Sequence, residues 1–226
     1  MSSRKEEKER LKAEREERER AAAAKAKRAR LLQLIGGVVV ACAIIAGVAY
    51  AVSNSGGGGG DDGTDVDDNK LKAAAQASGC VYRSFPDEGQ DHVTEQLTEA
   101  DYKTNPPTSG AHNPEPAGDG NYVAGNEPEI QNWVHTLEHG RILFQYRPGI
   151  EKSVVTQLES LFNEDVAGSG GAYHSVLMRN NSKMPFQVAA VGWRHYMACR
   201  EFTPESITAM RAFREEVVDK APERIP

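Results

Sequence analysis

The sequence predicts an α+β domain with a small mixed sheet covered by helices, preceded by a long N-terminal helix and a single transmembrane helix. Three observations predict this: an uncharged apolar run, a Gly- and Asp-rich stretch after it, and helical and strand patterns that alternate near the C-terminus. They divide the 226 residues into a charged helix (1–30), a membrane span (31–52), a linker (53–69) and a domain (70–226).

Residues 1–30 combine Glu, Lys, Arg and Ala, which are strong helix formers, without an apolar face. Residues 31–52 carry no charge, and as a helix they would extend about 33 Å, enough for a hydrocarbon core of about 30 Å. Lys and Arg precede this run directly, and positive charge stays in the cytoplasm. We therefore expect a plasma-membrane anchor with a cytoplasmic N-terminus and an extracytoplasmic domain. The small residues at 46–49 leave a cleaved signal peptide as the alternative.

Residues 53–69 contain five consecutive glycines and several aspartates, a composition typical of a flexible spacer. Charge is uneven along the chain, because residues 1–30 hold 12 Lys/Arg and 7 Glu, whereas residues 31–226 hold 15 Lys/Arg and 26 Asp/Glu. The acidic main body argues against a nucleic-acid partner, which needs a basic face. The three cysteines are too few for a disulfide-dense miniprotein or a four-cysteine zinc ribbon.

Cys80 and Cys199 are the cysteines of the domain, since Cys42 falls within the predicted span. Outside the cytoplasm such a pair usually forms a disulfide, so we expect one between Cys80 and Cys199. The alternative is a pair of thiolate ligands on a metal ion.

The domain begins with an irregular segment at 81–127, rich in Pro, Gly, Asn and Asp, in which residues 106–110 (PPTSG) predict a rigid turn. A helix follows at 128–139, with Pro128 near its start and Gly140 as its stop.

A strand is predicted at 141–147 and a second helix at 151–165. Apolar runs at 175–178 and 186–193 predict two more strands. The last helix starts at a Thr203 cap with Pro204 in its first turn and runs to about residue 219. This order of elements favours the α+β class.

The candidate metal ligands are His112, His135, His139 and Met178. His135 and His139 are four residues apart on the predicted helix, so both imidazoles can chelate one ion. His112 follows the rigid turn and is the third candidate. Met178 ends a predicted core strand, and its thioether would favour Cu(I). The sequence thus predicts one copper or zinc ion.

Structural roles are the alternative for each ligand: His139 next to the negative end of a helix dipole, His135 as a satisfied buried histidine, and Met178 in core packing. His92 follows Asp91 in a polar loop, and we expect it at the surface.

Residues 106–112 (PPTSGAH), followed by residues 135–149 (HTLEHGRILFQYRPG), resemble an uncharacterised family of membrane-anchored extracytoplasmic domains, mostly actinobacterial. The resemblance covers about residues 79–226. Its PPTSGxH and HxLEHG motifs place the three candidate histidines at recurrent positions, which strengthens the metal hypothesis. The family is a domain of unknown function, so the resemblance implies location and fold rather than a reaction.

The function we expect is a membrane-anchored extracytoplasmic copper- or zinc-binding domain in metal handling or sensing, with the membrane and a metal ion as partners. One alternative is a structural or interaction domain of the cell envelope without metal. Another is a zinc-dependent hydrolase, because His135-x-x-Glu138-His139 spells an inverted zinc-protease signature. There Glu138 would activate water, and Glu215 or Glu216 would supply a third ligand. No other catalytic set is predicted.

Overall fold

The computed structural model describes residues 66–223 and residue 225. The predicted helix at 1–30, the predicted membrane span at 31–52 and most of the predicted linker lie outside the described residues. Within the described part of the chain, no helix has the length and apolar character needed to cross a membrane.

The described residues form four α-helices, one short 3-10 helix and six strands. In chain order they are α2 (Asp68–Ser78), β1 (Val81–Ser84), η1 (Glu99–Asp101), β2 (Gly120–Asn121), α3 (Ile130–Glu138), β3 (Ile142–Tyr146), α4 (Lys152–Phe162), β4 (Ser175–Arg179), β5 (Val188–Gly192), β6 (His195–Cys199) and α5 (Pro204–Val217).

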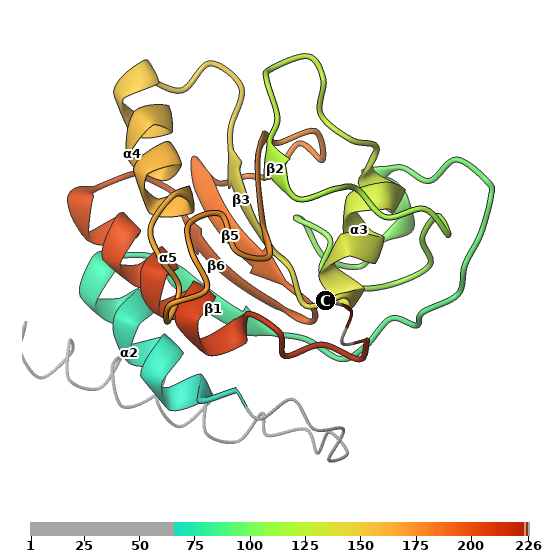
Figure 1. The fold of residues 1–226 in the computed structure, drawn as a ribbon, viewed down its shortest axis with the longest axis horizontal. Coiled ribbons are helices and arrows are strands. Elements are labelled where there is room, and N and C mark those ends of the chain that lie inside the picture. Colours follow the sequence, from blue (N-terminus) through green and yellow to red (C-terminus); the bar gives the residue numbers. More distant parts are fainter. Residues whose placement is uncertain (1–65, 224, 226) are drawn as a thin grey trace, which may run out of the picture. The chain divides into compact units, whose positions relative to one another are not determined.

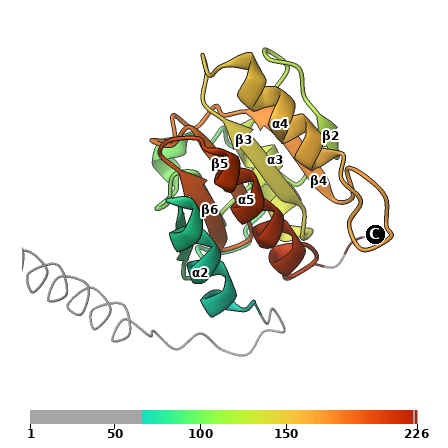
Figure 2. The same ribbon diagram turned by 90° about the vertical axis from the view of Figure 1, so that its left-hand side faces the viewer.

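The strands make one mixed sheet in the order β1-β6-β5-β3-β4-β2. Strand β4 pairs in parallel with β3 and β2, and the remaining pairs are antiparallel. Helices α2, α4 and α5 cover one face, whereas α3 lies on the other (Figures 1 and 2). The predicted α+β class with a mixed sheet is therefore confirmed.

Two hydrophobic clusters fill the two faces, because successive side chains of a strand point to opposite sides. On β3, Ile142 and Phe144 belong to the cluster under α2, α4 and α5, while Leu143 belongs to the cluster under α3. The same alternation runs through β4, β5 and β6. The strands thus carry nearly continuous apolar runs, as expected for a sheet that is buried on both faces.

Six of the predicted elements are confirmed with shifts of a few residues at their ends: α3, β3, α4, β4, β5 and α5. Helix α3 ends where Gly140 takes a positive φ of 80°, and α5 begins after Thr203, whose N–H donates to Ser206 Oγ at 3.0 Å.

The structure also contains elements that the sequence reading did not predict: α2, β1, the short β2 and β6. Helix α2 begins before the expected domain boundary at residue 70. The Asp67 side chain caps its first turn by accepting N–H bonds from Asn69 and Lys70, and Gly79 ends it with a φ of 68°. Both signals are present in the sequence as an N-cap acid and a C-terminal glycine.

Strand β6 was missed because it follows β5 after two residues. Gly192 pairs with His195, so Trp193 and Arg194 form the whole connection. Arg194 takes a positive φ of 63°, a conformation that glycine or asparagine usually fills in such turns. The turn therefore has no composition signal.

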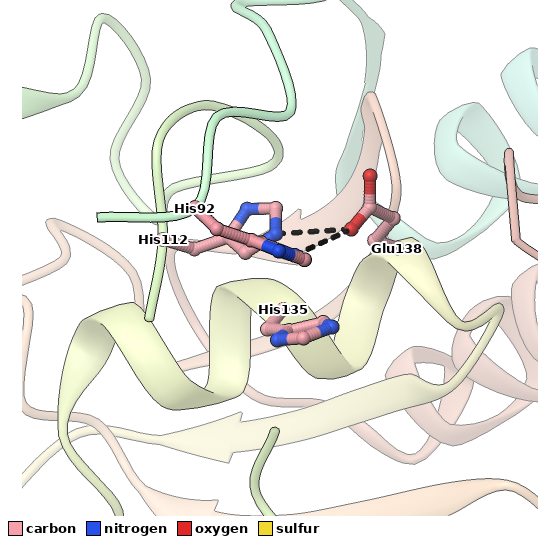
Figure 3. A group of neighbouring side chains, drawn as sticks. All are labelled: His92, His112, His135 and Glu138. Carbon is pink, nitrogen blue, oxygen red and sulfur yellow. Dashed lines mark ion pairs between the residues drawn. The ribbon is translucent and has the colours of Figure 1, made fainter. Parts of the chain in front are cut away.

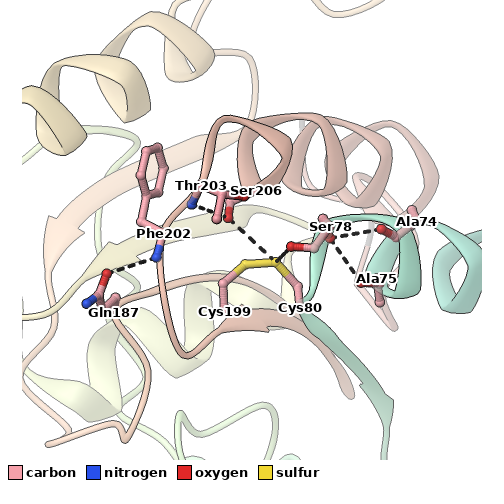
Figure 4. The surroundings of a disulfide bond; sticks show 9 residues. All are labelled: Ala74, Ala75, Ser78, Cys80, Gln187, Cys199, Phe202, Thr203 and Ser206. Atoms are coloured by element: carbon pink, nitrogen blue, oxygen red, sulfur yellow. Dashed lines mark hydrogen bonds between the residues drawn. A yellow bond between two sulfur atoms is a disulfide. The ribbon is translucent and has the colours of Figure 1, made fainter. Parts of the chain in front are cut away.

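The predicted disulfide is present between Cys80 and Cys199, whose Cα atoms are 4.3 Å apart (Figure 4). It joins the start of edge strand β1 to the end of β6 within the cluster under α2, α4 and α5. The Sγ atom of Cys80 lies 3.8 Å from Ser206 Oγ, near the start of α5. The bond thus ties the N-terminal part of the domain to its last strand.

Candidate metal centre

The irregular segment before α3 is held against this helix by backbone hydrogen bonds. The Asn113 N–H donates to Gln131 O at 3.2 Å, and the Ala117 N–H donates to Asn132 O at 3.1 Å. Thr136 Oγ1 donates to Ala117 O at 2.8 Å. A segment without regular structure is therefore fixed along the helix that carries two of the candidate ligands.

The predicted rigid turn is buried and anchored from two sides. The Thr108 carbonyl accepts the Arg194 N–H at 2.9 Å, and Ser109 Oγ accepts the Glu88 N–H at 3.0 Å. Gly110 takes a φ of +120°, and a Cβ at this position would lie 3.2 Å from the Tyr102 ring. The turn thus sets the direction of the residues that follow it.

His112 and His92 are paired through the backbone. An isolated parallel bridge joins them: the Val93 N–H donates to His112 O at 2.8 Å, and the His112 N–H donates to Asp91 O at 3.0 Å. The bridge brings the His92 ring to 4.9 Å from the His112 ring, measured between centroids. The expectation that His92 is a surface histidine is right for its 45% exposed side chain but misses this placement.

Four side chains form what we call the inner group: His92, His112, His135 and Glu138 (Figure 3). Each offers one ligand atom, and these atoms all lie within 4.8 Å of one another. The His135 ring is 4.7 Å from both the His92 ring and the His112 ring. Three imidazoles and one carboxylate therefore converge on one point beside α3.

In His112 and His135, the ring nitrogen Nδ1 is hydrogen-bonded to a backbone carbonyl. His112 Nδ1 lies 2.7 Å from Gly110 O, and His135 Nδ1 lies 2.7 Å from Asn113 O. A carbonyl oxygen only accepts, so each Nδ1 carries the proton. In the neutral ring, each Nε2 then presents a lone pair, as in histidines that bind metal ions.

Glu138 and His112 make an unusual contact. Glu138 Oε2 lies 2.9 Å from His112 Nε2, and both side chains are almost completely buried. The pair does not meet hydrogen-bond geometry, and neither atom has a hydrogen bond to a residue that the structure describes. Two buried acceptors that face each other repel, unless a proton or a cation lies between them.

Burial lowers the pKa of His135 below its usual value, and neighbouring His112 and His92 lower it further, although the Asn113 carbonyl opposes the change. A lower pKa favours the neutral imidazole, which is the form that binds metal ions.

His139 lies in a neighbouring set that we call the outer group: His135, His139 and Glu223. The His139 ring is 4.5 Å from the His135 ring, and His139 Nε2 is 3.3 Å from Glu223 Oε2. Burial, followed by the effect of His135, lowers the pKa of His139. The predicted trio is thus divided: His112 and His135 share the inner group, whereas His139 meets only His135.

The C-terminal tail brings Glu223 to this position. Gly140 follows His139 directly, and a Cβ at Gly140 would lie 2.8 Å from Asp219 Cα. The Asp219 N–H donates to Gly140 O at 2.9 Å, and the Glu223 N–H donates to Glu138 O at 3.1 Å. The close approach that glycine permits holds the tail against the end of α3.

The remaining candidates lie elsewhere. Met178 is fully buried in the hydrophobic cluster under α3, as a core side chain would be. Glu216 does not approach the histidines of α3; it accepts bonds from Lys70 Nζ at 2.9 Å and Lys220 Nζ at 2.8 Å. His174 Nδ1 contacts Asp219 Oδ1 at 2.5 Å.

Sequence reasoning missed three members of these groups as ligands: His92, Glu138 and Glu223. Glu138 had a usable signal, because a residue three positions after His135 shares its helix face. His92 and Glu223 had none, since the backbone pairing with His112 and the course of the tail bring them in.

A comparison with known protein families matches residues 92–225 to the family described as "Protein of unknown function (DUF3105)". The match contains all members of the inner and outer groups. No curated protein matches the chain, and no solved structure matches it. Because the family match covers more than half of the sequence, the chain belongs to the DUF3105 family.

Proposed function

We propose that this protein binds one divalent transition-metal ion, zinc or copper, through His92, His112, His135 and Glu138. The observation that carries the proposal is the contact between His112 Nε2 and Glu138 Oε2, which are buried 2.9 Å apart without hydrogen bonds. A cation between them would turn a repulsive contact into two coordinate bonds. Ligand atoms on a tetrahedral ion with bonds of about 2.0–2.1 Å lie about 3.3 Å apart, close to this separation.

The donor types support a divalent ion. Imidazole suits zinc and copper, and a carboxylate oxygen is a harder donor that favours the divalent state. Met178 packs in the hydrophobic cluster under α3, so the thioether argument for Cu(I) loses its support. Three nitrogens and one oxygen would complete a four-coordinate zinc site.

The exposure of the inner group supports metal handling or sensing. His112 and Glu138 are buried, whereas the His92 side chain is 45% exposed. An ion held there would have one ligand at the surface, unlike the ion of a fully closed structural site. Because the sequence predicts a membrane anchor with an extracytoplasmic domain, we propose that the site acts outside the cytoplasm.

The test is a metal titration of the full-length chain, purified in detergent and stripped of metal, with Zn²⁺ and Cu²⁺ in separate experiments. We expect about one ion per chain. His135→Ala should lower the metal affinity by at least about 100-fold. Loss of a residue that only hydrogen-bonds to a metal ligand costs about 10–100-fold, and loss of the ligand itself should cost more. His174→Gln is the matched control, since this histidine contacts Asp219 outside both groups.

Two results would contradict the proposal. The first is a parent chain that takes up neither ion at micromolar concentration. The second is unchanged stoichiometric binding by a His112→Ala/His135→Ala double variant that keeps the circular dichroism spectrum of the parent. Either result would favour the alternative of a structural domain of the envelope.

A further inference from the structure

The inner and outer groups share one side chain, His135. Its Nδ1 is occupied by the Asn113 carbonyl at 2.7 Å, so Nε2 is the nitrogen available to an ion. One nitrogen lone pair forms one coordinate bond. The two groups are therefore alternative positions for a single ion rather than two sites that fill together through His135.

The two positions differ in what they offer. The inner group has four ligands, including the fully buried His112 and the almost fully buried Glu138. The outer group has three, and its Glu223 side chain is 45% exposed. The larger number of ligands and the burial of His112 and Glu138 favour residence in the inner group. The outer group has fewer ligands, so it should release an ion more readily.

The His135 ring is adjacent to a ring of each position. The His139 ring is 4.5 Å from the His135 ring, and the His135 ring is 4.7 Å from the His112 ring. Glu223 is held at the outer end, because its N–H donates to the Glu138 carbonyl at 3.1 Å. An ion bound by His139 and Glu223 would already be at His135, the first ligand of the inner group.

We propose that His139 and Glu223 form a transit position, from which an arriving divalent metal ion passes through His135 to the inner group and through which it also leaves. This inference rests on the proposed function. The transit step involves exchange of ligands only; no bond within the protein is broken, and the carboxylate of Glu223 supplies a negative charge that attracts the cation.

The experiment measures the kinetics of Zn²⁺ loading and release in the full-length chain, by stopped-flow competition with a fluorescent chelator. Glu223→Gln is the main variant, because the exposed side chain can change without disturbing the core. His139→Ala is the second. We expect both to slow loading and release by about tenfold or more while Kd changes less than about threefold, since a transient position alters the barrier and not the end states.

Glu115→Gln is the control for general electrostatic steering, because it removes the same charge from an exposed acid outside both groups. It should load at the parent rate. Unchanged rates in Glu223→Gln and His139→Ala would overturn the transit proposal, as would a second ion bound per chain. A drop in affinity as large as the drop in loading rate would also overturn it, by making these residues permanent ligands. A parent chain that binds no ion would overturn the proposed function itself.

Discussion

Each face of the sheet is covered by a helix with a poorly exposed glutamate, and the two glutamates have different surroundings. On α5, Glu216 accepts hydrogen bonds from Lys70, Lys220 and the Asp67 N–H. On α3, Glu138 is only 2% exposed, and its Oε2 faces imidazole nitrogens without a hydrogen bond. Glu216 is surrounded by hydrogen-bond donors, whereas Glu138 Oε2 faces imidazole rings.

This difference suits Glu216 to stabilising the fold and Glu138 to the proposed binding of a metal ion. Burial alone would raise the pKa of Glu216, but the bonds from Lys220, Lys70 and the Asp67 N–H lower it to about 2. The charge of Glu216 is thus matched within the protein. The side chains that face Glu138 Oε2 are imidazoles, which match a negative charge only when they are protonated. The proposed metal ion would match the charge of Glu138 from outside the protein.

The largest expected effect concerns the covalent bond on the α2/α5 face. Reduction of Cys80–Cys199, which spans 119 residues, should lower the free energy of unfolding by up to about 5 kcal/mol on the chain-entropy model. For a domain of this size, that corresponds to a decrease in Tm on the order of 10 °C.

Thermal unfolding with and without reductant measures this decrease. Because the bond lies on the face opposite the inner group, Zn²⁺ affinity below the lower Tm should stay within about threefold of the oxidised value. A loss of affinity comparable to that of His135→Ala would show that the two faces are not independent.

A smaller effect, with opposite signs on the two faces, is expected for amide substitutions. In metal-free protein at pH 8, Glu138→Gln should raise the free energy of unfolding by about 1 kcal/mol, because the new N–H donor can pair with the His112 Nε2 lone pair. Glu216→Gln should lower it by a similar amount, since it removes a charge that two lysines match. Urea unfolding of both variants measures the difference.

Metal affinity should show the reverse order. Glu138→Gln should bind Zn²⁺ much more weakly than the parent, and Glu216→Gln should bind it equally well. If metal-free Glu138→Gln is less stable than the parent, then Glu138 forms an ion pair with a protonated His112. The pair would then stabilise the fold, and its burial would not indicate a metal site.

The smallest effect is the part of the pH dependence of stability that Glu216 contributes. Its pKa in the folded protein is about 2, below the ordinary value of 4.5. The ionised group therefore stabilises the fold fully above about pH 4.5, and this contribution is lost as the pH falls toward 2. The stability difference between the parent and Glu216→Gln, on the order of 1 kcal/mol at pH 7, should shrink through this interval. A difference that is constant from pH 7 to pH 2.5 would contradict the assignment.

Local sequence signals were sufficient for much of the fold. Pro128 and Gly140 lie within two residues of the ends of α3, and Thr203 with Pro204 marks the start of α5. These signals act within one helical turn, so they can be read without knowledge of tertiary contacts. Strand β1 and the short β2 depend instead on pairing with distant strands, and a four-residue strand such as Val81–Ser84 leaves little periodicity to detect.

The candidate site was predictable where its residues share an element. His135 and His139 were found by helical spacing, and the turn before His112 indicated a fixed direction. Spacing alone could not show that Glu223 joins His139 in a second group, which shares His135 with the inner group. Nor could spacing show that a backbone bridge brings His92 to the inner group, because this bridge joins two segments that are distant in sequence.

The disulfide also determines which residues a pulling force on the chain would reach through covalent bonds. When tension is applied between Asp67 and Glu223, the covalent path runs along α2 to Cys80, crosses to Cys199 and continues into α5. Residues 81–198 form a closed loop outside this load path, and the loop holds all four members of the inner group. Glu223 lies beyond Cys199 and bears the load. A pull on the chain would therefore reach Glu223 through covalent bonds, whereas it would reach the four members of the inner group only through non-covalent contacts.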